Sequence, residues 1–474
     1  MTADVSETES TNNYDPRYPK KLLDFVLESW GPAQPQISAP HRVAEHTVKR
    51  RQRLVEEFPG EWLVVPTGKA KARANDTDYL FRPDSGFYWL TGSTESDQVL
   101  VIDASGEATL FVPPRADTST SRFITDRRYG EAWVGPRLGL EETALLLGIK
   151  TAPLPEVESV LSAIPAGRVR VLRGVDPQID AVITGDEEMD SAFAVTLSEL
   201  RLIKDAYEVA RLREACESSA RGFEDVVREL ASAKQTSERW VEGTFYRRAR
   251  TEGNDTGYHS ICAAGEHGTT LHYWRNDGTV RDGDLLLLDA GVEHVELYTA
   301  DITRTMPISG KFTEPQLEIY NLVLAAQEAA IAVTRPGAKY SDPNTAAMEV
   351  LARGLFDLGI LPVTPEESLE KESGLHRRWT LHGVSHMLGI DVHDCAKARA
   401  ELYTEGELKE GHVFTIEPGL YFRTNDELVP ERFRGIGIRI EDDFVVTADG
   451  CENLSAMLPR SAEEVEAWMS ACIR

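Results

Sequence analysis

The stretch LLLLDAGVEHVELYTADITRT, residues 285–305, constrains the fold more than any other part of the chain. Residues 285–288 form an apolar run that predicts a buried strand, and this strand delivers Asp289 at its end. Asp301 follows twelve residues later and opens a second β-type segment after a connection of turn length. Two carboxylates brought together repel each other, and a metal cation relieves that repulsion. The alternative is that both aspartates cap turns or pair with an arginine such as Arg304.

The length and charge of the chain limit its organisation and its partners. Its 474 residues exceed a typical single domain and predict two domains. The 51 basic and 78 acidic residues give a formal net charge of -27, which argues against nucleic acid or an anionic membrane as the main partner. No apolar run approaches the roughly 20 residues of a membrane span. Five scattered cysteines without a C-x-x-C pair fit a reducing compartment, so we expect a cytoplasmic location.

Changes in sequence pattern divide the chain into four predicted parts. Residues 1–40 begin with a polar leader and form an N-terminal extension. Residues 41–175 mix helical and strand patterns, including a hairpin in which QVLVI and EATLFV flank DASG, and predict a small α/β domain. Residues 176–196 are acidic and irregular, which suits a linker. Residues 197–474 form the second domain, and nine of the eleven histidines lie in it.

The first domain contains an aromatic-rich stretch, DTDYLFRPDSGFYWLTG, at residues 76–92. Five aromatic side chains in seventeen positions are too dense for an ordinary surface loop. One interpretation is that they fill the core of this domain. The other is that Phe87, Tyr88 or Trp89 contributes to a ligand cleft that subunit association completes.

Four further stretches in the second domain carry candidate site residues. HGVSHMLGIDVHD places three histidines within twelve residues, and VFTIEPGLY puts an acid between an apolar strand and a Pro-Gly turn. GIGIRIEDDFVV alternates so that an arginine and an acid share one face, where a purely structural ion pair is the alternative. LHYWRND adds a histidine ahead of the first acidic strand. The candidates are His382, His386 and His393, then Glu417, then Arg439 and Glu441, and finally His272.

The candidate metal ligands are Asp289, Asp301, His386, Glu417 and Glu441. They supply four carboxylates and one imidazole without a thiolate. Such an oxygen-rich set suits manganese or a similar divalent ion and differs from a structural zinc site. Four negative charges balance two divalent cations, whereas a single cation would leave an excess of about two charges. The sequence therefore predicts two divalent metal ions per subunit, with manganese favoured.

These motifs resemble those of the pita-bread metallopeptidases and, within that family, the Xaa-Pro aminopeptidases. LLLDAG, ADITRT, HGVSHMLGIDVHD, TIEPGLY and RGIGIRIEDD occur in the family's order, and the resemblance covers nearly the whole chain after about residue 40. The stretch at residues 76–92 resembles part of the family's N-terminal domain. The resemblance implies an α/β (α+β) fold, with a small aminopeptidase P-type domain followed by a pita-bread catalytic domain.

The resemblance also implies a role for each metal ligand. Asp289 would bind one metal, and Asp301 with Glu441 would bridge both. His386 and Glu417 would complete the other site. In the family a hydroxide that bridges the two metals attacks the scissile carbonyl, and Glu417 would then carry the proton.

The other four candidates would contact the substrate or support the ligands. His393 would stabilise the oxyanion, His272 and His382 would line the proline side of the cleft, and Arg439 would anchor the ligands. The implied substrates are peptides with proline at the second position, and the implied assembly is a homodimer or homotetramer. Prolidase, which cuts only Xaa-Pro dipeptides, stays open as an alternative activity. A catalytically inactive pita-bread protein that binds a partner is the alternative of another class.

Overall fold

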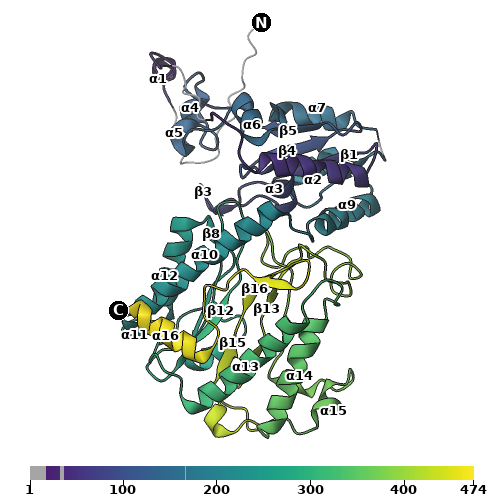
Figure 1. The fold of residues 1–474 in the computed structure, drawn as a ribbon. Coiled ribbons are helices and arrows are strands. Elements are labelled where there is room, and N and C mark those ends of the chain that lie inside the picture. The colour runs from purple at the N-terminus through teal and green to yellow at the C-terminus, as the bar shows by residue number, and fades with distance from the viewer. Residues whose placement is uncertain (1–17, 32–36, 166, 474) are drawn as a thin grey trace. The chain divides into compact units, whose positions relative to one another are not determined.

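The chain divides into two compact units, residues 1–197 and 198–474, within the computed structural model (Figure 1). The structure describes residues 18–31, 37–165 and 167–473. The predicted N-terminal extension, residues 1–40, lies partly outside the described residues, and its described part contains the short helix α1 (Lys20–Phe25). Both units combine helices and strands, as the sequence predicted.

Unit 1 is built on a mixed five-stranded sheet with the strand order β6-β5-β4-β1-β7. The predicted hairpin is present, because β4 and β5 pair antiparallel, while β6 and β7 join the sheet in parallel pairs with β5 and β1. The strands are β1 (Trp62–Pro66), β4 (Val99–Ile102), β5 (Ala108–Val112), β6 (Lys150–Pro153) and β7 (Val169–Val171). The main helices are α2 (Ala44–Glu57), α3 (Ser85–Thr91), α6 (Leu140–Leu147), α7 (Val157–Ser162), α8 (Pro177–Val182) and α9 (Glu187–Leu200).

The aromatic side chains of α3 belong to the core of unit 1. Phe87, Tyr88 and Trp89 are each at most 1% exposed. Arg50 of α2 packs over the Trp89 ring, and its guanidinium donates a hydrogen bond to the Trp89 carbonyl. The interpretation that these three rings line an accessible ligand cleft is therefore wrong, because their side chains are buried in the core of their own unit.

Residues 176–196 differ from the predicted linker, because they contain α8 and most of α9 and belong to unit 1. Two of the acidic residues of this stretch, Asp176 and Asp186, cap the starts of these helices. Asp176 accepts a hydrogen bond from the Gln178 N–H at 2.9 Å, and Asp186 accepts one from the Met189 N–H at 3.0 Å. Carboxylates at these positions accept hydrogen bonds from the otherwise free N–H groups of the first turn, and their negative charge interacts favourably with the positive end of the helix dipole. The acidic residues of this stretch therefore mark the N-termini of two helices and not a linker.

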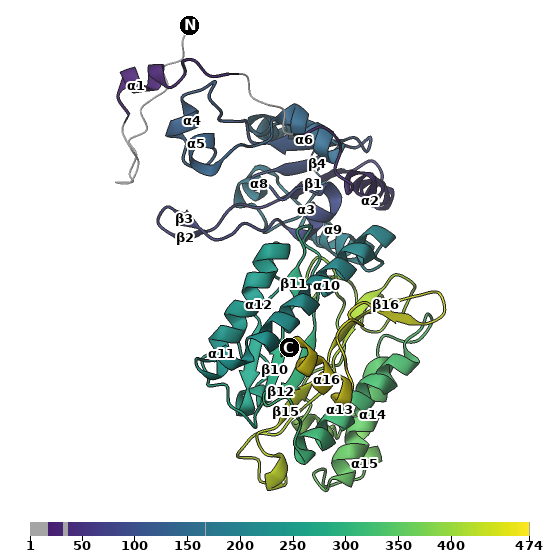
Figure 2. The same cartoon turned by 60° about the vertical axis from the view of Figure 1, so that its left-hand side comes forward.

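Unit 2 consists of small antiparallel sheets flanked by long helices (Figures 1 and 2). Its sheets have the orders β12-β10-β9, β13-β16-β17, β14-β15 and β11-β8. The strands are β8 (Asp255–Thr256), β9 (Ile261–Ala264), β10 (Leu285–Asp289), β11 (Val292–Glu293), β12 (Thr303–Pro307), β13 (Val413–Ile416), β14 (Gly419–Tyr421), β15 (Gly437–Arg439), β16 (Asp442–Val446) and β17 (Cys451–Asn453). The helices are α10 (Ala206–Arg228), α11 (Leu230–Lys234), α12 (Glu238–Glu252), α13 (Glu314–Val333), α14 (Asp342–Asp357), α15 (Pro365–Leu369) and α16 (Ala462–Ile473).

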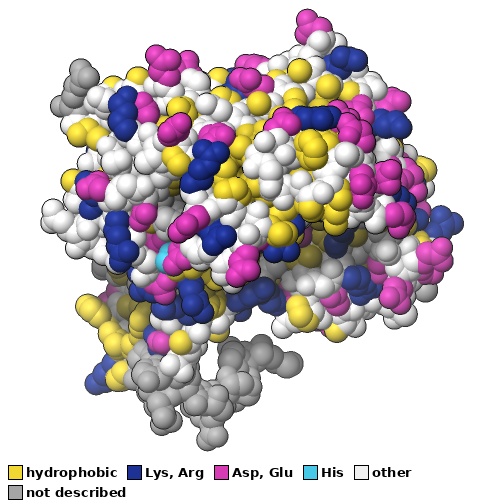
Figure 3. All heavy atoms as spheres, turned by 90° about the horizontal axis from the view of Figure 1, so that it is seen from below, with side chains coloured by type: hydrophobic (Ala, Val, Ile, Leu, Met, Phe, Trp, Pro, Cys, Tyr) yellow, Lys and Arg dark blue, Asp and Glu magenta, His cyan; other side chains and the backbone are white. Residues whose placement is uncertain are grey.

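The core of unit 2 lies where α13 and α14 pack against the strands. Ile319 of α13, Leu351 of α14, Phe414 of β13 and Ile438 of β15 belong to one buried cluster, and all four are fully buried. This packing fixes the strands whose ends carry the candidate site. None of the described helices is both long and apolar enough to cross a membrane. On the face shown in Figure 3, acidic side chains are interspersed with basic ones.

Candidate metal centre

The four candidate carboxylates meet because they lie at neighbouring strand ends. Asp289 is the last residue of β10, and Asp301 lies two positions before β12, its antiparallel neighbour. Glu417 directly follows β13, and Glu441 directly precedes β16, which pairs antiparallel with β13. A bridge between Thr303 and Glu441 connects the two sheets. The predicted strand ends at Asp289 and Glu417 are confirmed, whereas Glu441 lies in the break between β15 and β16 and not within the single alternating strand that the sequence predicted.

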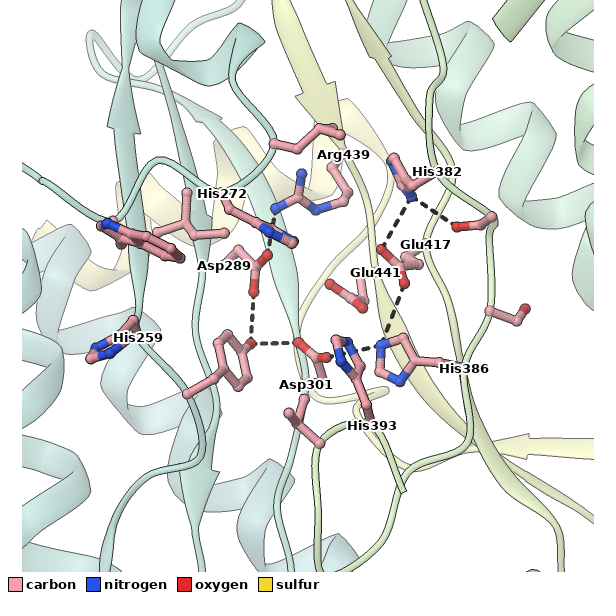
Figure 4. Close-up of a pocket in the computed structure, with 17 residues that line it drawn as sticks. His259, His272, Asp289, Asp301, His382, His386, His393, Glu417, Arg439 and Glu441 are labelled. Carbon is pink, nitrogen blue, oxygen red and sulfur yellow. Dashed lines mark hydrogen bonds and ion pairs between the residues drawn. The ribbon is translucent and has the colours of Figure 1, made fainter. Parts of the chain in front are cut away.

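A pocket of about 460 Å³ contains all nine residues that the sequence predicted for the site (Figure 4). Within it, Asp301 and Glu441 lie between Asp289 on one side and His386 with Glu417 on the other (Figure 4). The remaining members line the same pocket, and they are His272, His382, His393 and Arg439. The structure therefore brings every candidate residue together.

Asp289 and Asp301 share a hydrogen-bond donor that the sequence did not reveal. The Tyr258 hydroxyl lies 2.7 Å from Asp289 Oδ1 and 2.5 Å from Asp301 Oδ1. The backbone N–H of Asp301 donates to Asp443 Oδ2 at 3.0 Å, which fixes the start of this segment from the opposite side. These contacts hold the two aspartates in place without neutralising them.

His386 contacts two of the acids through one ring nitrogen. Its Nε2 atom lies 3.3 Å from Asp301 Oδ2 and 3.4 Å from Glu417 Oε1. Burial alone would lower the pKa of His386, but the hydrogen bond to Asp301 and the charge of Glu417 raise it to about 9. The His393 ring stands edge-on to the His386 ring at 4.4 Å between centroids, and burial together with the His386 charge lowers the pKa of His393.

Arg439 links the acids to the wall of the pocket. Its guanidinium pairs with Asp289 and donates to the Tyr421 hydroxyl at 2.9 Å and to Thr303 Oγ1 at 3.2 Å. Thr303 in turn donates to Glu441 at 2.6 Å, and Tyr421 contacts His382 Nε2 at 2.7 Å. The arrangement makes Arg439 a buried hub of the hydrogen-bond network.

The pocket contains more negative charge than its own cations compensate. Burial raises the pKa of Glu417 to about 7 and raises the pKa of Asp289. Burial and the charge of Asp301 raise the pKa of Glu441 well above its usual value. Carboxyl groups buried beside other carboxylates retain protons unless a cation replaces them. The acids of this pocket therefore form a site whose charge favours cation binding.

The donor set fits divalent metal ions. Asp301, His386 and Glu441 each offer a ligand atom within 4.8 Å of the others. Asp289 and Glu417 extend this group on either side (Figure 4). Four carboxylates and one imidazole, without a thiolate among the lining residues, match the ligand preference of hard divalent ions.

Several residues of the pocket were missed by the sequence interpretation. Tyr258, His259, Leu271 and Trp274 line it. The His259 and Trp274 rings meet edge-on, with centroids 6.0 Å apart. Their segments have no strand-end acid and no histidine cluster, so no pattern distinguished them from ordinary loop residues. The LHYWRND stretch, which was selected for its histidine, was the one available signal for Trp274.

Family models match both units. The model described as "Metallopeptidase family M24" matches residues 210–448, and the model "Aminopeptidase P, N-terminal domain" matches residues 47–172. These matches identify unit 2 as the pita-bread domain and unit 1 as the domain that accompanies it in aminopeptidase P. The predicted fold is confirmed.

Relatives resemble the chain along nearly its full length. "Xaa-Pro aminopeptidase 1" of Streptomyces coelicolor is 50% identical over 465 residues, which cover 97% of this chain and 94% of the relative. "Xaa-Pro aminopeptidase" of Escherichia coli is 34% identical, and the match covers 89% of this chain and 97% of the relative. The solved structure of zinc-substituted E. coli aminopeptidase P in complex with product has a TM-score of 0.81 and 32% identity, and the match covers 92% of this chain and 100% of that one. The chain therefore belongs to metallopeptidase family M24, among the Xaa-Pro aminopeptidases.

Proposed function

We propose that the chain hydrolyses the peptide bond between an N-terminal residue and a following proline, with two divalent metal ions at its centre. The observation that carries this proposal is the convergence of four carboxylates, three of them buried and that of Glu417 partly buried, and one imidazole in a single pocket. Asp301 and Glu441 occupy the middle of the group, so we assign them to bridge the ions (Figure 4). Asp289 would complete one ion's ligands, and His386 with Glu417 the other's. When bound, such ions polarise a carbonyl and lower the pKa of water.

Glu417 is proposed to carry the proton during hydrolysis. Its Oε1 atom faces His386 at 3.4 Å and its Oε2 atom faces His382 at 3.5 Å. An acid at this position can accept a proton from the attacking water and return it to the leaving proline nitrogen. His393 is proposed to donate a hydrogen bond to the carbonyl oxygen as negative charge develops on it.

The remaining residues are proposed to orient the substrate and the ligands. His272 and His382 line the pocket and would contact the proline ring and its carbonyl group. Arg439 would hold the Asp289 carboxylate in the orientation that metal binding needs, because hydrogen bonds to Thr303 and Tyr421 fix the guanidinium at the same time.

Four finer assignments belong to the same proposal. Manganese is the proposed metal because the donors are oxygen-rich. A cytoplasmic location follows from the scattered cysteines, which are free among the described residues. Peptides are the proposed partners because the relatives are Xaa-Pro aminopeptidases, while the formal net charge of -27 disfavours nucleic acid. A homodimer or homotetramer is proposed because unit 1 exposes large apolar side chains, including Phe25, Trp30, Tyr79 and Leu80.

Metal analysis and two peptides test the proposal. The purified protein should bind about two manganese ions per chain, the number expected of a dinuclear hydrolase. With manganese it should cleave Arg-Pro-Pro after the arginine. Cleavage of Gly-Pro but not of Arg-Pro-Pro would identify a prolidase instead. A protein that binds no metal and cleaves neither peptide would contradict the proposal and favour a binding protein.

A further inference from the structure

Unit 2 contains a charged cavity that lies apart from the metal pocket. It has a volume of about 550 Å³, and among the described residues it shares no lining residue with the metal pocket. Its walls come from residues within 264–267, 279–285, 313–316 and 424–436. The second of these segments runs into β10 and the last runs into β15. The charged cavity therefore lies at the starts of two strands whose other ends carry Asp289 and Arg439.

Hydrogen bonds between the segments fix the walls of the charged cavity. The Gln316 side chain donates to the Gly283 carbonyl at 2.9 Å and accepts from the Thr313 N–H at 2.9 Å. These two bonds tie the start of α13 to the segment that precedes β10. The Arg434 Nε atom donates to the Val429 carbonyl at 2.9 Å, which holds the segment that precedes β15. The position of each wall is therefore set by the fold.

Charged side chains of both signs line this cavity. The basic ones are Arg281, Arg432 and Arg434, and the acidic ones are Glu266 and Asp284. Arg432 is balanced by Glu318, an acid outside the lining, at 2.9 Å. Within the part of the chain that the structure describes, the other four side chains make no ion pair. The cavity therefore offers two cationic and two anionic groups to a ligand.

The surroundings of Asp284 favour an added positive charge. Asp284 is half-buried, and burial raises the pKa of its carboxyl group. The charge of Arg281 opposes this shift, and the charge of Glu266 adds to it. Gly265 has a φ of +57°, and a Cβ atom at this position would lie 3.1 Å from Asp284 Oδ2, so the glycine leaves room beside the carboxylate. An ammonium group placed beside Asp284 and Glu266 would relieve the repulsion between the two acids.

The guanidinium groups of Arg281 and Arg434 supply the opposite charge. Arg434 is half-buried, and its Nε atom alone has a hydrogen-bond partner among the described residues. Arg281 is exposed, and its guanidinium has no partner in the same described ranges. A planar guanidinium binds a carboxylate through two parallel hydrogen bonds. These two arginines therefore suit a ligand carboxylate.

We propose that the charged cavity binds a small zwitterion, either a free α-amino acid or a short peptide. The carboxylate of the ligand pairs with Arg281 and Arg434. Its ammonium group pairs with Glu266 and Asp284. A simple anion would meet two acids in this cavity, and a simple cation would meet two arginines, whereas a ligand with both charges satisfies all four groups. The inference goes beyond the proposed function and does not depend on it, because the cavity and the metal pocket have separate linings.

Isothermal titration calorimetry of the full-length protein tests this site with matched probes. The zwitterions are L-alanine and Ala-Ala, and the tighter of the two identifies the source of the ligand. N-acetyl-L-alanine lacks the ammonium group, and L-alaninamide lacks the carboxylate. A zwitterion should bind with a Kd of about 1 mM or tighter, both with manganese present and after its removal by a chelator. Each blocked probe should bind at least about tenfold more weakly.

Variants locate the binding in the charged cavity. Arg434→Gln and Asp284→Asn should each weaken the binding of the zwitterion at least about tenfold. Arg423→Gln and Asp282→Asn are the matched controls, since both residues are exposed, lie within one position of a lining residue and line neither cavity. The controls should bind as the wild type does. Thermal melting checks that all four variants are folded.

Several results would overturn the inference. Equal binding of N-acetyl-L-alanine and L-alanine would show an anion site, and equal binding of L-alaninamide and L-alanine would show a cation site. Binding that disappears with the metal, or that both folded cavity variants retain, would place the ligand elsewhere. Absence of binding by both zwitterions would remove the site altogether. Failure to cleave Arg-Pro-Pro would count against the proposed function alone.

Discussion

Unit 2 contains two groups of buried or partly buried acidic side chains. The negative charge of one group is balanced by neighbouring basic side chains, and that of the other is not. In the metal pocket, burial raises the pKa of Glu417 and of Glu441. In the second group, which we call the Asp394 cluster, Asp394 pairs with Arg201 and lies 2.9 Å from Lys204 Nζ. Burial acts to raise the pKa of Asp394 as well, but the charges of Arg201 and Lys204 hold it well below its usual value.

The difference separates a structural group from a functional one. The Asp394 cluster contains its own cations, so the folded chain is complete without a ligand. The metal pocket holds four carboxylates against the cations Arg439 and His386, which among the described residues are too few to balance the negative charge. Perturbed carboxyl groups in a pocket are typical of functional sites. Removing an acid should therefore have opposite consequences in the two groups.

The largest expected effect is on activity in the metal pocket. Asp301→Ala and Glu441→Ala should each abolish peptide cleavage and reduce the metal content, because each of these acids would hold both of the proposed ions. The metal-free variants should remain folded, since each substitution removes repulsion among buried acids. Peptide hydrolysis, metal analysis and thermal melting in a chelator measure the three quantities. Asp449→Ala, at an exposed acid, is the control.

Two outcomes would count against this assignment. Wild-type turnover with two bound metals in either variant would show that the residue does not bridge the ions. Unfolding of the metal-free variants would show that these acids stabilise the fold in the same way as the Asp394 cluster, and the contrast between the two groups would disappear.

Asp394→Ala tests the opposite behaviour. It removes the acid and leaves the buried charges of Arg201 and Lys204 without their main partner. Breaking a buried ion pair in this way lowers the free energy of unfolding by about 3 to 5 kcal/mol. Chemical denaturation of the metal-free protein measures the change. Equal stability of Asp394→Ala and wild type would mean that the cluster is not compensated as the structure indicates.

His393→Ala should have a smaller effect, confined to the reaction. His393 lies beside the proposed ligand His386 but lines the pocket with a pKa lowered by burial, in keeping with a neutral hydrogen-bond donor. Its removal should lower kcat by about 10²-fold. The metal content should stay at the wild-type value. Loss of metal with little change in turnover per bound metal would instead make His393 a ligand.

The metal pocket was predictable from the sequence because its residues stand at strand ends. An apolar run that stops at Asp289 or at Glu417 predicts both a buried strand and the position where that strand ends. Antiparallel pairing then brings such ends together, which is why the residues chosen from these patterns lie in one pocket. Tyr258 was not predictable, because it precedes β9 in a segment without periodicity, and its contacts with Asp289 and Asp301 depend on the tertiary fold.

The Asp394 cluster was not predictable for a related reason. Arg201 and Asp394 are separated by 193 positions, and each occurs in a stretch rich in charges that normally face solvent. The same limit applies to Trp89. The sequence shows that it lies in a stretch dense in aromatic residues, but only the structure shows that its side chain is buried. Composition shows which groups are present, but pairing over long sequence distances decides which of them are buried together.

The smallest expected effect is a pH dependence at the edge of the Asp394 cluster. His412 is 3% exposed, and its pKa is lowered to about 4 by burial and by the charges of Lys204 and Lys409. Between about pH 4 and its ordinary pKa near 6.5, the unfolded chain therefore binds a proton that the folded chain does not. Folded stability must fall as the pH falls through this range, and it regains nothing below it.

Between about pH 7 and pH 5, the titration of His412 should lower the free energy of unfolding by about 2 kcal/mol. His412→Asn removes the titrating ring and keeps an acceptor for the Lys409 N–H, which donates to His412 Nδ1 at 3.3 Å. The difference in unfolding free energy between the two proteins, measured without metal, should shift in favour of the variant as the pH falls. A difference that stays constant with pH would mean that folding leaves the pKa of His412 at its ordinary value, so that neither burial nor the charges of Lys204 and Lys409 act on the ring as the structure indicates.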